Sequence, residues 1–152
     1  MGLNTGVVGR PESALGERLV RGALAGIAGG VVFGVLMGMM GMLPMVAGLV
    51  GSSSVVVGLL LHLVLSAVIG AGYGLVLGSL GGTYVGGLWT GAVYGVAWWI
   101  LGPLLIMPLM MGMGPQFGTA LSSAMLMSLM GHLLYGLVTG LAYAVQASRA
   151  RS

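Results

Sequence analysis

From Gly22 to Ser148 the chain contains no aspartate, glutamate, lysine or arginine. A soluble domain carries roughly a quarter charged residues, but charged residues make up only 5% of these 152 residues and hydrophobic residues make up 58%. The mean hydropathy of +1.11 also lies far above that of water-soluble domains. An uncharged stretch of this length predicts a chain that crosses a lipid bilayer.

The uncharged stretch divides into four apolar segments, and each is about as long as the roughly 20 residues that a helix needs to cross the hydrocarbon layer. Clusters of proline, glycine and serine separate the segments. A membrane β-barrel would need strands that alternate apolar and polar residues, which these segments lack. The sequence therefore predicts an all-α integral membrane four-helix bundle with spans at 22–43, 55–78, 85–107 and 119–146.

The basic residues flank the spans on both sides: Arg10, Arg18 and Arg21 before them, Arg149 and Arg151 after them. An even number of spans places both ends on one side of the membrane, and the positive-inside rule makes that side the cytoplasm. We therefore expect a protein of the cytoplasmic (inner) membrane with a cytoplasmic N-terminal segment at 1–21, which includes a short interfacial helix, a four-span domain at 22–148 and a cytoplasmic tail at 149–152. Because topology explains the arginines, the net charge of +3 does not indicate nucleic-acid binding.

The chain contains an internal repeat. Residues 62–73 and 132–143 align without a gap, with His, Leu, Val, Gly and Tyr in register, and upstream Gly22, Gly26 and Gly30 match Gly87, Gly91 and Gly95. The repeat predicts two tandem helical hairpins. Because each hairpin has an even number of spans, the copies keep one orientation and are expected to show parallel pseudo-twofold symmetry about the membrane normal. His62 and His132 then lie at the same depth.

Small residues recur at every fourth position in each span, and such faces let helix backbones approach closely in lipid. The predicted packing residues are Gly26, Gly30, Gly34, Gly70, Gly74, Gly91, Gly95, Gly136 and Gly140. The connections between spans are too short to form an extramembrane domain. These features favour a non-enzymatic structural or accessory subunit that associates through its glycine faces with itself or with a larger membrane complex.

The two histidines are the only residues of the spans that titrate near neutral pH. Each imidazole is expected to hydrogen-bond a neighbouring helix, and methionine commonly fills irregular gaps. However, the methionines gather with the histidines toward the side opposite the arginines, and thioether and imidazole ligands together suit Cu(I). The alternative function is therefore ligand binding by His62, His132, Met39, Met42, Met111, Met113 and Met130. A tetrapyrrole of the haem or chlorophyll type, ligated axially by the two histidines, is the other possible ligand.

Other functions find less support in the sequence. Ser128 lies one turn before His132, but the spans hold no acidic residue that would orient the imidazole for nucleophilic catalysis. Coupled transport normally uses carboxylates inside the membrane, which leaves a passive pore for a small neutral solute as a second alternative. The chain has no cysteine, so disulfides and thiolate metal sites are excluded.

Aromatic residues and prolines give two further local expectations. Tyr73, Tyr84, Trp89 and Tyr143 lie near the cytoplasmic ends of the spans and are expected to anchor the helices at the membrane interface. Pro103 and Pro108 are expected to kink the outer end of the third span.

Three sequence stretches resemble a widespread family of small four-span prokaryotic integral membrane proteins of unknown function. They are Trp98-Trp99, Ile106-Met107-Pro108-Leu109-Met110 and Gly131-His132-Leu133-Leu134-Tyr135-Gly136. The resemblance covers nearly all of the second repeat and part of the first. It implies a four-span fold and a membrane location, and it assigns no catalytic residue.

Overall fold

A computed structural model describes residues 11–150, and the regular elements among them are all helical. The long helices are α1 (Pro11–Met39), α3 (Val55–Leu77), α4 (Tyr84–Leu101) and α6 (Ser123–Arg149). A π-helical turn, η1 (Gly102–Ile106), and the short helix α5 (Met107–Met110) extend α4, and α2 (Leu43–Gly48) and η2 (Phe117–Thr119) lie in the connections. The outer parts of the expected N-terminal segment and C-terminal tail, 1–10 and 151–152, lie outside the described residues.

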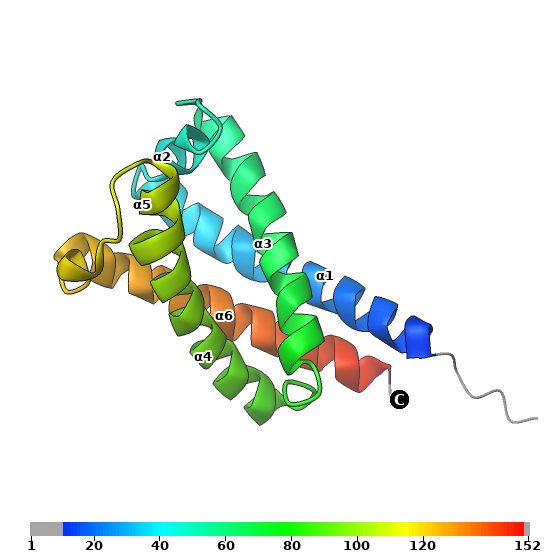
Figure 1. Ribbon diagram of the computed structural model, residues 1–152. Helices are drawn as coiled ribbons and strands as arrows, with labels where there is room; N and C mark the ends of the chain where they lie inside the picture. Colours follow the sequence, from blue (N-terminus) through cyan, green and yellow to red (C-terminus); the bar gives the residue numbers. More distant parts are fainter. Residues whose placement is uncertain (1–10, 151–152) are drawn as a thin grey trace, which may run out of the picture.

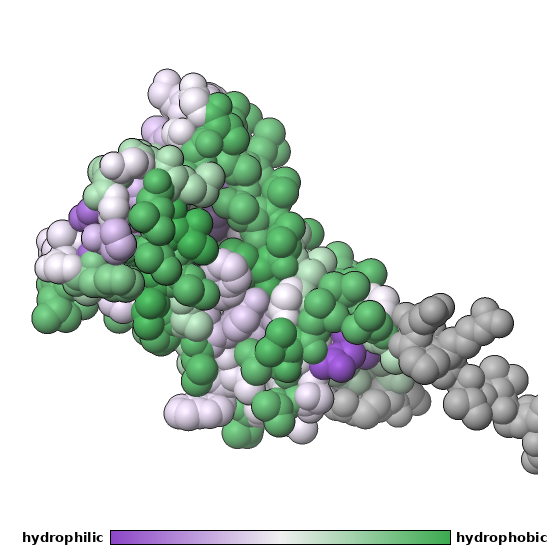
Figure 2. Space-filling model, viewed as in Figure 1, coloured by the Kyte–Doolittle hydropathy of each residue, from purple (hydrophilic) through white to green (hydrophobic). Residues whose placement is uncertain are grey.

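Four stretches are long and apolar enough to cross a membrane. They are Ala14–Met39, Val55–Leu77, Tyr84–Met110 and Ser123–Arg149, with mean hydropathies of 1.9, 2.4, 1.7 and 1.5. Large apolar side chains cover most of the outer surface of the molecule, shown in green in Figure 2. Such a surface suits contact with lipid rather than with water. The all-α, multi-pass organisation predicted from the sequence is confirmed at this level.

The helix ends differ from the expected spans for local reasons. α1 begins at Pro11 and runs without a break into the first span, so the expected interfacial helix is not a separate element. α1 ends at Met39 rather than 43 because Gly41 takes a left-handed φ of 67°, which stops a helix. α6 begins at Ser123 rather than 119 because Ser122 caps it, its Oγ accepting a hydrogen bond from the Met125 N–H at 3.3 Å.

The bundle consists of two helical hairpins packed side by side (Figure 1). α1 packs along α3, α4 packs along α6, and contact between α1 and α6 joins the two hairpins. The start of α1 and the end of α6 lie at one end of the bundle, which we call the terminal end, and α2 and α5 lie at the other (Figure 1).

The glycine faces hold each hairpin together. A Cβ atom added at Gly26 of α1 would lie 2.6 Å from the Gly70 Cα of α3 and closer still to the Ser66 carbonyl oxygen. In the second hairpin, a Cβ atom at Gly91 of α4 would lie 2.9 Å from the Gly136 carbonyl carbon of α6. The helices are therefore in direct backbone contact, which only glycine permits at these positions.

The other predicted packing glycines also face neighbouring helices. Gly30 faces Ser66, Gly34 faces His62, Gly74 faces Arg18 and Gly22, Gly95 faces His132, and Gly140 faces Gly87. The pairs of the first hairpin correspond to those of the second at the offsets of the sequence repeat. Because these faces are occupied inside the chain, a partner protein would have to bind elsewhere.

Tyrosines fill the terminal end of the bundle. Tyr73 and Tyr143 are almost completely buried, and their rings meet edge to face with centroids 5.5 Å apart. The Tyr73 hydroxyl and Thr90 Oγ1 share a hydrogen bond of 2.6 Å. The expectation that Tyr73 and Tyr143 anchor the helices at the membrane surface is therefore wrong, because both rings pack inside the bundle. Tyr84 and Trp89 are exposed, 55% and 71% respectively, as an interfacial position requires.

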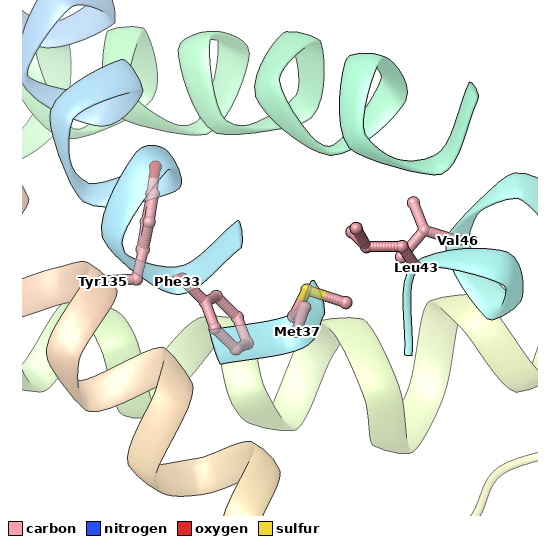
Figure 3. Close-up of a cluster of buried hydrophobic side chains, with 5 residues drawn as sticks. All are labelled: Phe33, Met37, Leu43, Val46 and Tyr135. Atoms are coloured by element: carbon pink, nitrogen blue, oxygen red, sulfur yellow. The ribbon is translucent and has the colours of Figure 1, made fainter. Parts of the chain in front are cut away.

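A second cluster of buried side chains lies toward the opposite end and consists of Phe33, Met37, Leu43, Val46 and Tyr135 (Figure 3). It packs α2 against α1 and brings α6 into the same core. The Tyr135 hydroxyl donates a hydrogen bond to the Ser66 carbonyl oxygen at 2.9 Å. This bond links α6 to α3 and so connects the two hairpins at mid-height.

Candidate functional site

A cavity of about 540 Å³ lies at the α2/α5 end of the bundle, and we call it the chamber. Its walls come from α1, α2, α3, α6 and the continuous α4–η1–α5 segment, and it is partly open at the protein surface. Small-molecule sites typically have volumes of roughly 300–1,000 Å³. In Figure 2, hydrophilic atoms are visible recessed between the apolar surfaces of α3 and α4 at this end.

The chamber exists because α3 and α4 separate toward the α2/α5 end, as Figure 1 shows. Nearer the terminal end a side chain joins them, because the Tyr94 hydroxyl of α4 donates a hydrogen bond to the Ile69 carbonyl oxygen of α3 at 2.7 Å. Beyond Tyr94 the third span changes to the π-helical turn η1, which includes Pro103. Proline has no N–H to donate, so the regular α-helical ladder breaks there, as the prolines predicted.

His62 projects from α3 into the chamber wall. Its Nε2–H donates a hydrogen bond of 2.9 Å to the carbonyl oxygen of Gly30 in α1. The ring fits there because Gly34, one turn further along α1, has no side chain: a Cβ atom would lie 3.2 Å from the His62 Cδ2. Because a carbonyl oxygen only accepts, this bond places the proton on Nε2 and leaves Nδ1 of the neutral ring as an acceptor.

His132 of α6 lies in the same chamber with the opposite tautomer. Its Nδ1–H donates to the carbonyl oxygen of Ser128, one turn earlier in α6, at 2.8 Å. Nε2 is therefore the acceptor nitrogen of this neutral ring. Nε2 lies toward Gly102 of η1, since a Cβ atom there would come within 3.8 Å of it.

Phe33 of α1 brings the two imidazoles into one aromatic cluster. Its ring meets His62 edge to face with centroids 5.5 Å apart and meets His132 in the same manner at 4.9 Å. Phe33 is itself held against Gly131, where any side chain would collide with its ring. The two histidines predicted from the repeat are therefore brought together around one phenyl ring.

Methionine is the most frequent residue type in the chamber wall. The lining methionines are Met37, Met42, Met45, Met107, Met110, Met111, Met113 and Met125. Three of the predicted ligands, Met42, Met111 and Met113, are among them. Met39 and Met130 are 80% and 59% exposed and lie outside the lining, so the expected grouping of these two with the histidines is wrong.

Sequence reasoning missed other methionines of the chamber, although helical phasing could have found one of them. Met125 precedes Ser128 by three residues and His132 by seven, so all three share one face of α6. Met107 had no comparable signal, because its direction depends on the π-helical turn before it. Met37 is almost fully buried and reaches the chamber one turn after Phe33.

The donor set limits what the chamber can do chemically. Among residues 11–150, no group of three or more His, Cys, Asp or Glu side chains is arranged to hold a metal ion, so a metal would need thioether ligands. Ser128 Oγ lies 3.4 Å from His132 Nδ1, but that nitrogen already carries the proton donated to the Ser128 carbonyl. This imidazole nitrogen therefore cannot remove the hydroxyl proton, and Ser128 is not set up as a nucleophile.

No protein-family model, curated protein or solved structure matches this chain. The function is therefore inferred from the chamber itself.

Proposed function

We propose that this is a non-enzymatic multi-pass membrane protein that binds Cu(I) in its chamber. One observation carries the proposal: a single cavity is lined by two imidazoles, each with one nitrogen free to accept, and by eight methionines of the described chain. Histidines that ligate metals almost always donate their other N–H to a carboxylate, a backbone carbonyl or water, which fixes the ring. Both His62 and His132 have this arrangement.

The charge of the chamber favours a monovalent ion. No aspartate or glutamate among residues 11–150 lines it, so the ligands that these residues offer are neutral. The cost of moving an ion from water into a medium of low dielectric constant rises steeply with the charge of the ion, and here no anionic ligand from this part of the chain compensates. Thioethers are soft ligands that select Cu(I) over hard cations.

A tetrapyrrole fits the chamber less well than Cu(I) does. Axial ligation by both histidines needs clear space beside each ring, but Phe33 packs against both imidazoles. Within the described part of the chain, no arginine or lysine lines the chamber to pair with propionate groups. The absorption spectrum of the purified protein separates the two ligands, because a bound tetrapyrrole is coloured and Cu(I) is not.

The accessory-subunit and pore functions have weaker support. The glycine faces expected to bind a partner are occupied within the hairpins. A self-association or a complex with another subunit would instead use the apolar outer surface. A passive pore would have to pass the buried cluster of Ala25, Tyr73, Tyr143 and Ala147, which fills the terminal end of the bundle.

The orientation and symmetry form part of the same proposal. Arg18, Arg21 and Arg149 lie on the helix ends that meet at the terminal end, which supports a cytoplasmic location for both termini in the inner membrane. The equivalent contacts of Gly26 and Gly91 support a duplicated hairpin with a pseudo-twofold axis. The resemblance to small four-span prokaryotic membrane proteins agrees with this arrangement.

Anaerobic titration of the detergent-purified protein with Cu(I), in competition with a chromophoric Cu(I) chelator, tests the proposal. We expect one tightly held ion, and His62→Gln and His132→Ala should each weaken binding by at least about tenfold, as loss of a ligand or its support does. The His62→Gln side chain retains an N–H for the Gly30 carbonyl, so its effect reports coordination rather than packing.

Met39→Leu and Met130→Leu are the matched controls, because both methionines lie outside the chamber. These variants should bind Cu(I) as the wild type does. A wild-type protein that takes up no Cu(I), or histidine variants that bind as tightly as the wild type, would overturn the proposal.

A further inference from the structure

The methionines of the chamber are not equally buried, and their exposure changes in one direction. Met110, Met111 and Met113, at the end of α5 and in the connection that follows, are 65%, 44% and 57% exposed. Met107 and Met125 are half-buried, and Met37 is only 7% exposed. The chamber therefore has an outer set of thioethers at its mouth and an inner set beside the histidines.

The outer thioethers lie on a connection with defined backbone structure. The N–H of Met113 donates to the Pro108 carbonyl oxygen at 2.9 Å, and the N–H of Gln116 donates to the Leu104 carbonyl oxygen of η1 at 2.8 Å. Gly112 and Gly114 on either side of Met113 both take a left-handed φ of 73°. The reversal of the chain at these glycines lets Met111 and Met113 both reach the chamber mouth.

We infer that Met110, Met111 and Met113 form an uptake relay that receives Cu(I) from an aqueous soft-ligand donor and passes it to Met37, Met107, Met125 and the two histidines. This inference rests on the proposed function. In each step a bond from Cu(I) to a donor sulfur breaks as a bond to a methionine sulfur forms. The ion stays Cu(I) throughout, and no proton moves because thioethers are not protonated.

Two physical properties make the outer set suitable for transfer and the inner set suitable for retention. An exposed thioether can approach a donor complex in water, which buried Met37 cannot do. A neutral ligand adds no charge at the membrane surface, so the ion meets no electrostatic trap before it reaches the imidazoles, which are stronger donors than thioethers. A relay of this kind changes rates but not the final equilibrium.

The test compares three triple variants by stopped-flow mixing of the detergent-purified protein with a coloured Cu(I)–chelator complex. The mouth variant is Met110→Leu, Met111→Leu and Met113→Leu, and the inner variant is Met37→Leu, Met107→Leu and Met125→Leu. The matched control replaces three exposed methionines outside the chamber lining: Met39→Leu, Met127→Leu and Met130→Leu.

We expect the mouth variant to take up Cu(I) at least about tenfold more slowly and to release it to excess chelator more slowly by the same factor, so that its Kd stays within about threefold of the wild type. The inner variant should raise the Kd by at least about tenfold, and the control should match the wild type. Circular dichroism verifies that each variant keeps its helical content.

The outcomes separate the two proposals. A mouth variant with unchanged rates, or with a Kd raised as much as in the inner variant, overturns the relay while Cu(I) binding stands. A wild-type protein that binds no Cu(I) overturns the proposed function and the relay with it.

Discussion

Replacing Gly26 by alanine tests how the first hairpin is held together. A Cβ atom at this position would meet the Ser66 carbonyl oxygen and would lie 2.6 Å from the Gly70 Cα and 3.0 Å from the Gly70 nitrogen. These are backbone atoms of α3, so no side-chain rotation relieves the clash. Ordinary contact begins at 3.4 Å, so α1 and α3 must separate locally by about 0.8 Å, a gap that forfeits at least a quarter of the dispersion energy of the atoms concerned.

The cost follows from the dispersion energy that this gap removes. A buried side chain makes roughly 40–60 atom contacts worth about 0.1–0.2 kcal/mol each, so removing a quarter of one such set costs about 1–3 kcal/mol. Gly16→Ala is the control, because Gly16 also lies within α1 but its Cβ atom would have no neighbouring heavy atom of the described residues within 4 Å. The helix-propensity gain of about 0.5–1 kcal/mol is common to both variants and cancels in their difference.

We therefore expect Gly26→Ala to be less stable than Gly16→Ala by about 1–3 kcal/mol. The free energy of unfolding can be measured in mixed micelles by titrating a denaturing detergent and following helicity by circular dichroism. Equal stability of the two variants would refute the direct backbone contact between α1 and α3.

Other parts of the fold give three further predictions. Gly91→Ala, the equivalent change in the second hairpin, should destabilise the protein to the same extent as the change in the first, measured in the same assay; a negligible effect would contradict the duplication. Arg18→Ala should cost about 1 kcal/mol, because Nε and Nη2 donate to the Gly74 and Leu75 carbonyl oxygens at the end of α3 at 3.1 and 2.7 Å; an unchanged free energy of unfolding would show that these bonds contribute nothing. Because the chain has no cysteine, Ser53→Cys in the α2–α3 connection gives a single reporter, which a membrane-impermeant maleimide should label in intact cells, while a fluorescent protein fused to the C-terminus remains fluorescent. Labelling only after lysis would reverse the proposed orientation.

The number and class of the helices were predictable because lipid imposes strong rules on sequence. Backbone groups in hydrocarbon must bond within a helix or a closed barrel, and the absence of charge between Gly22 and Ser148 left four helical segments. The glycine spacing also indicated the contact faces. It could not indicate whether Gly26 meets another helix of the same chain or a partner, because both contacts require the same small residues.

The composition of the chamber was only partly predictable. The repeat pointed to His62 and His132, and both line the cavity. The methionines near them were grouped by position along the chain, which fails on a helix because neighbours in sequence point in different directions. Met39 therefore faces outward, although Met37, two residues earlier, is buried beside Phe33.

The tyrosines show a different limit of sequence reasoning. Tyrosine near the end of a span fits a membrane interface or a polar partner inside the bundle equally well. The choice depends on Thr90, whose hydroxyl meets that of Tyr73, and Thr90 lies on a helix of the other hairpin. Only the packing of the two hairpins reveals that pairing.

X-ray absorption spectroscopy at the copper K-edge of the Cu(I)-loaded protein is the sharpest test of metal binding in the chamber, because it identifies the atoms bound to the metal. We predict a Cu(I) edge and a first shell that contains both nitrogen and sulfur, with the nitrogen contribution reduced in His62→Gln. A shell of sulfur alone, a shell of nitrogen or oxygen alone, or no retained copper after desalting would contradict a chamber built from imidazole and thioether ligands.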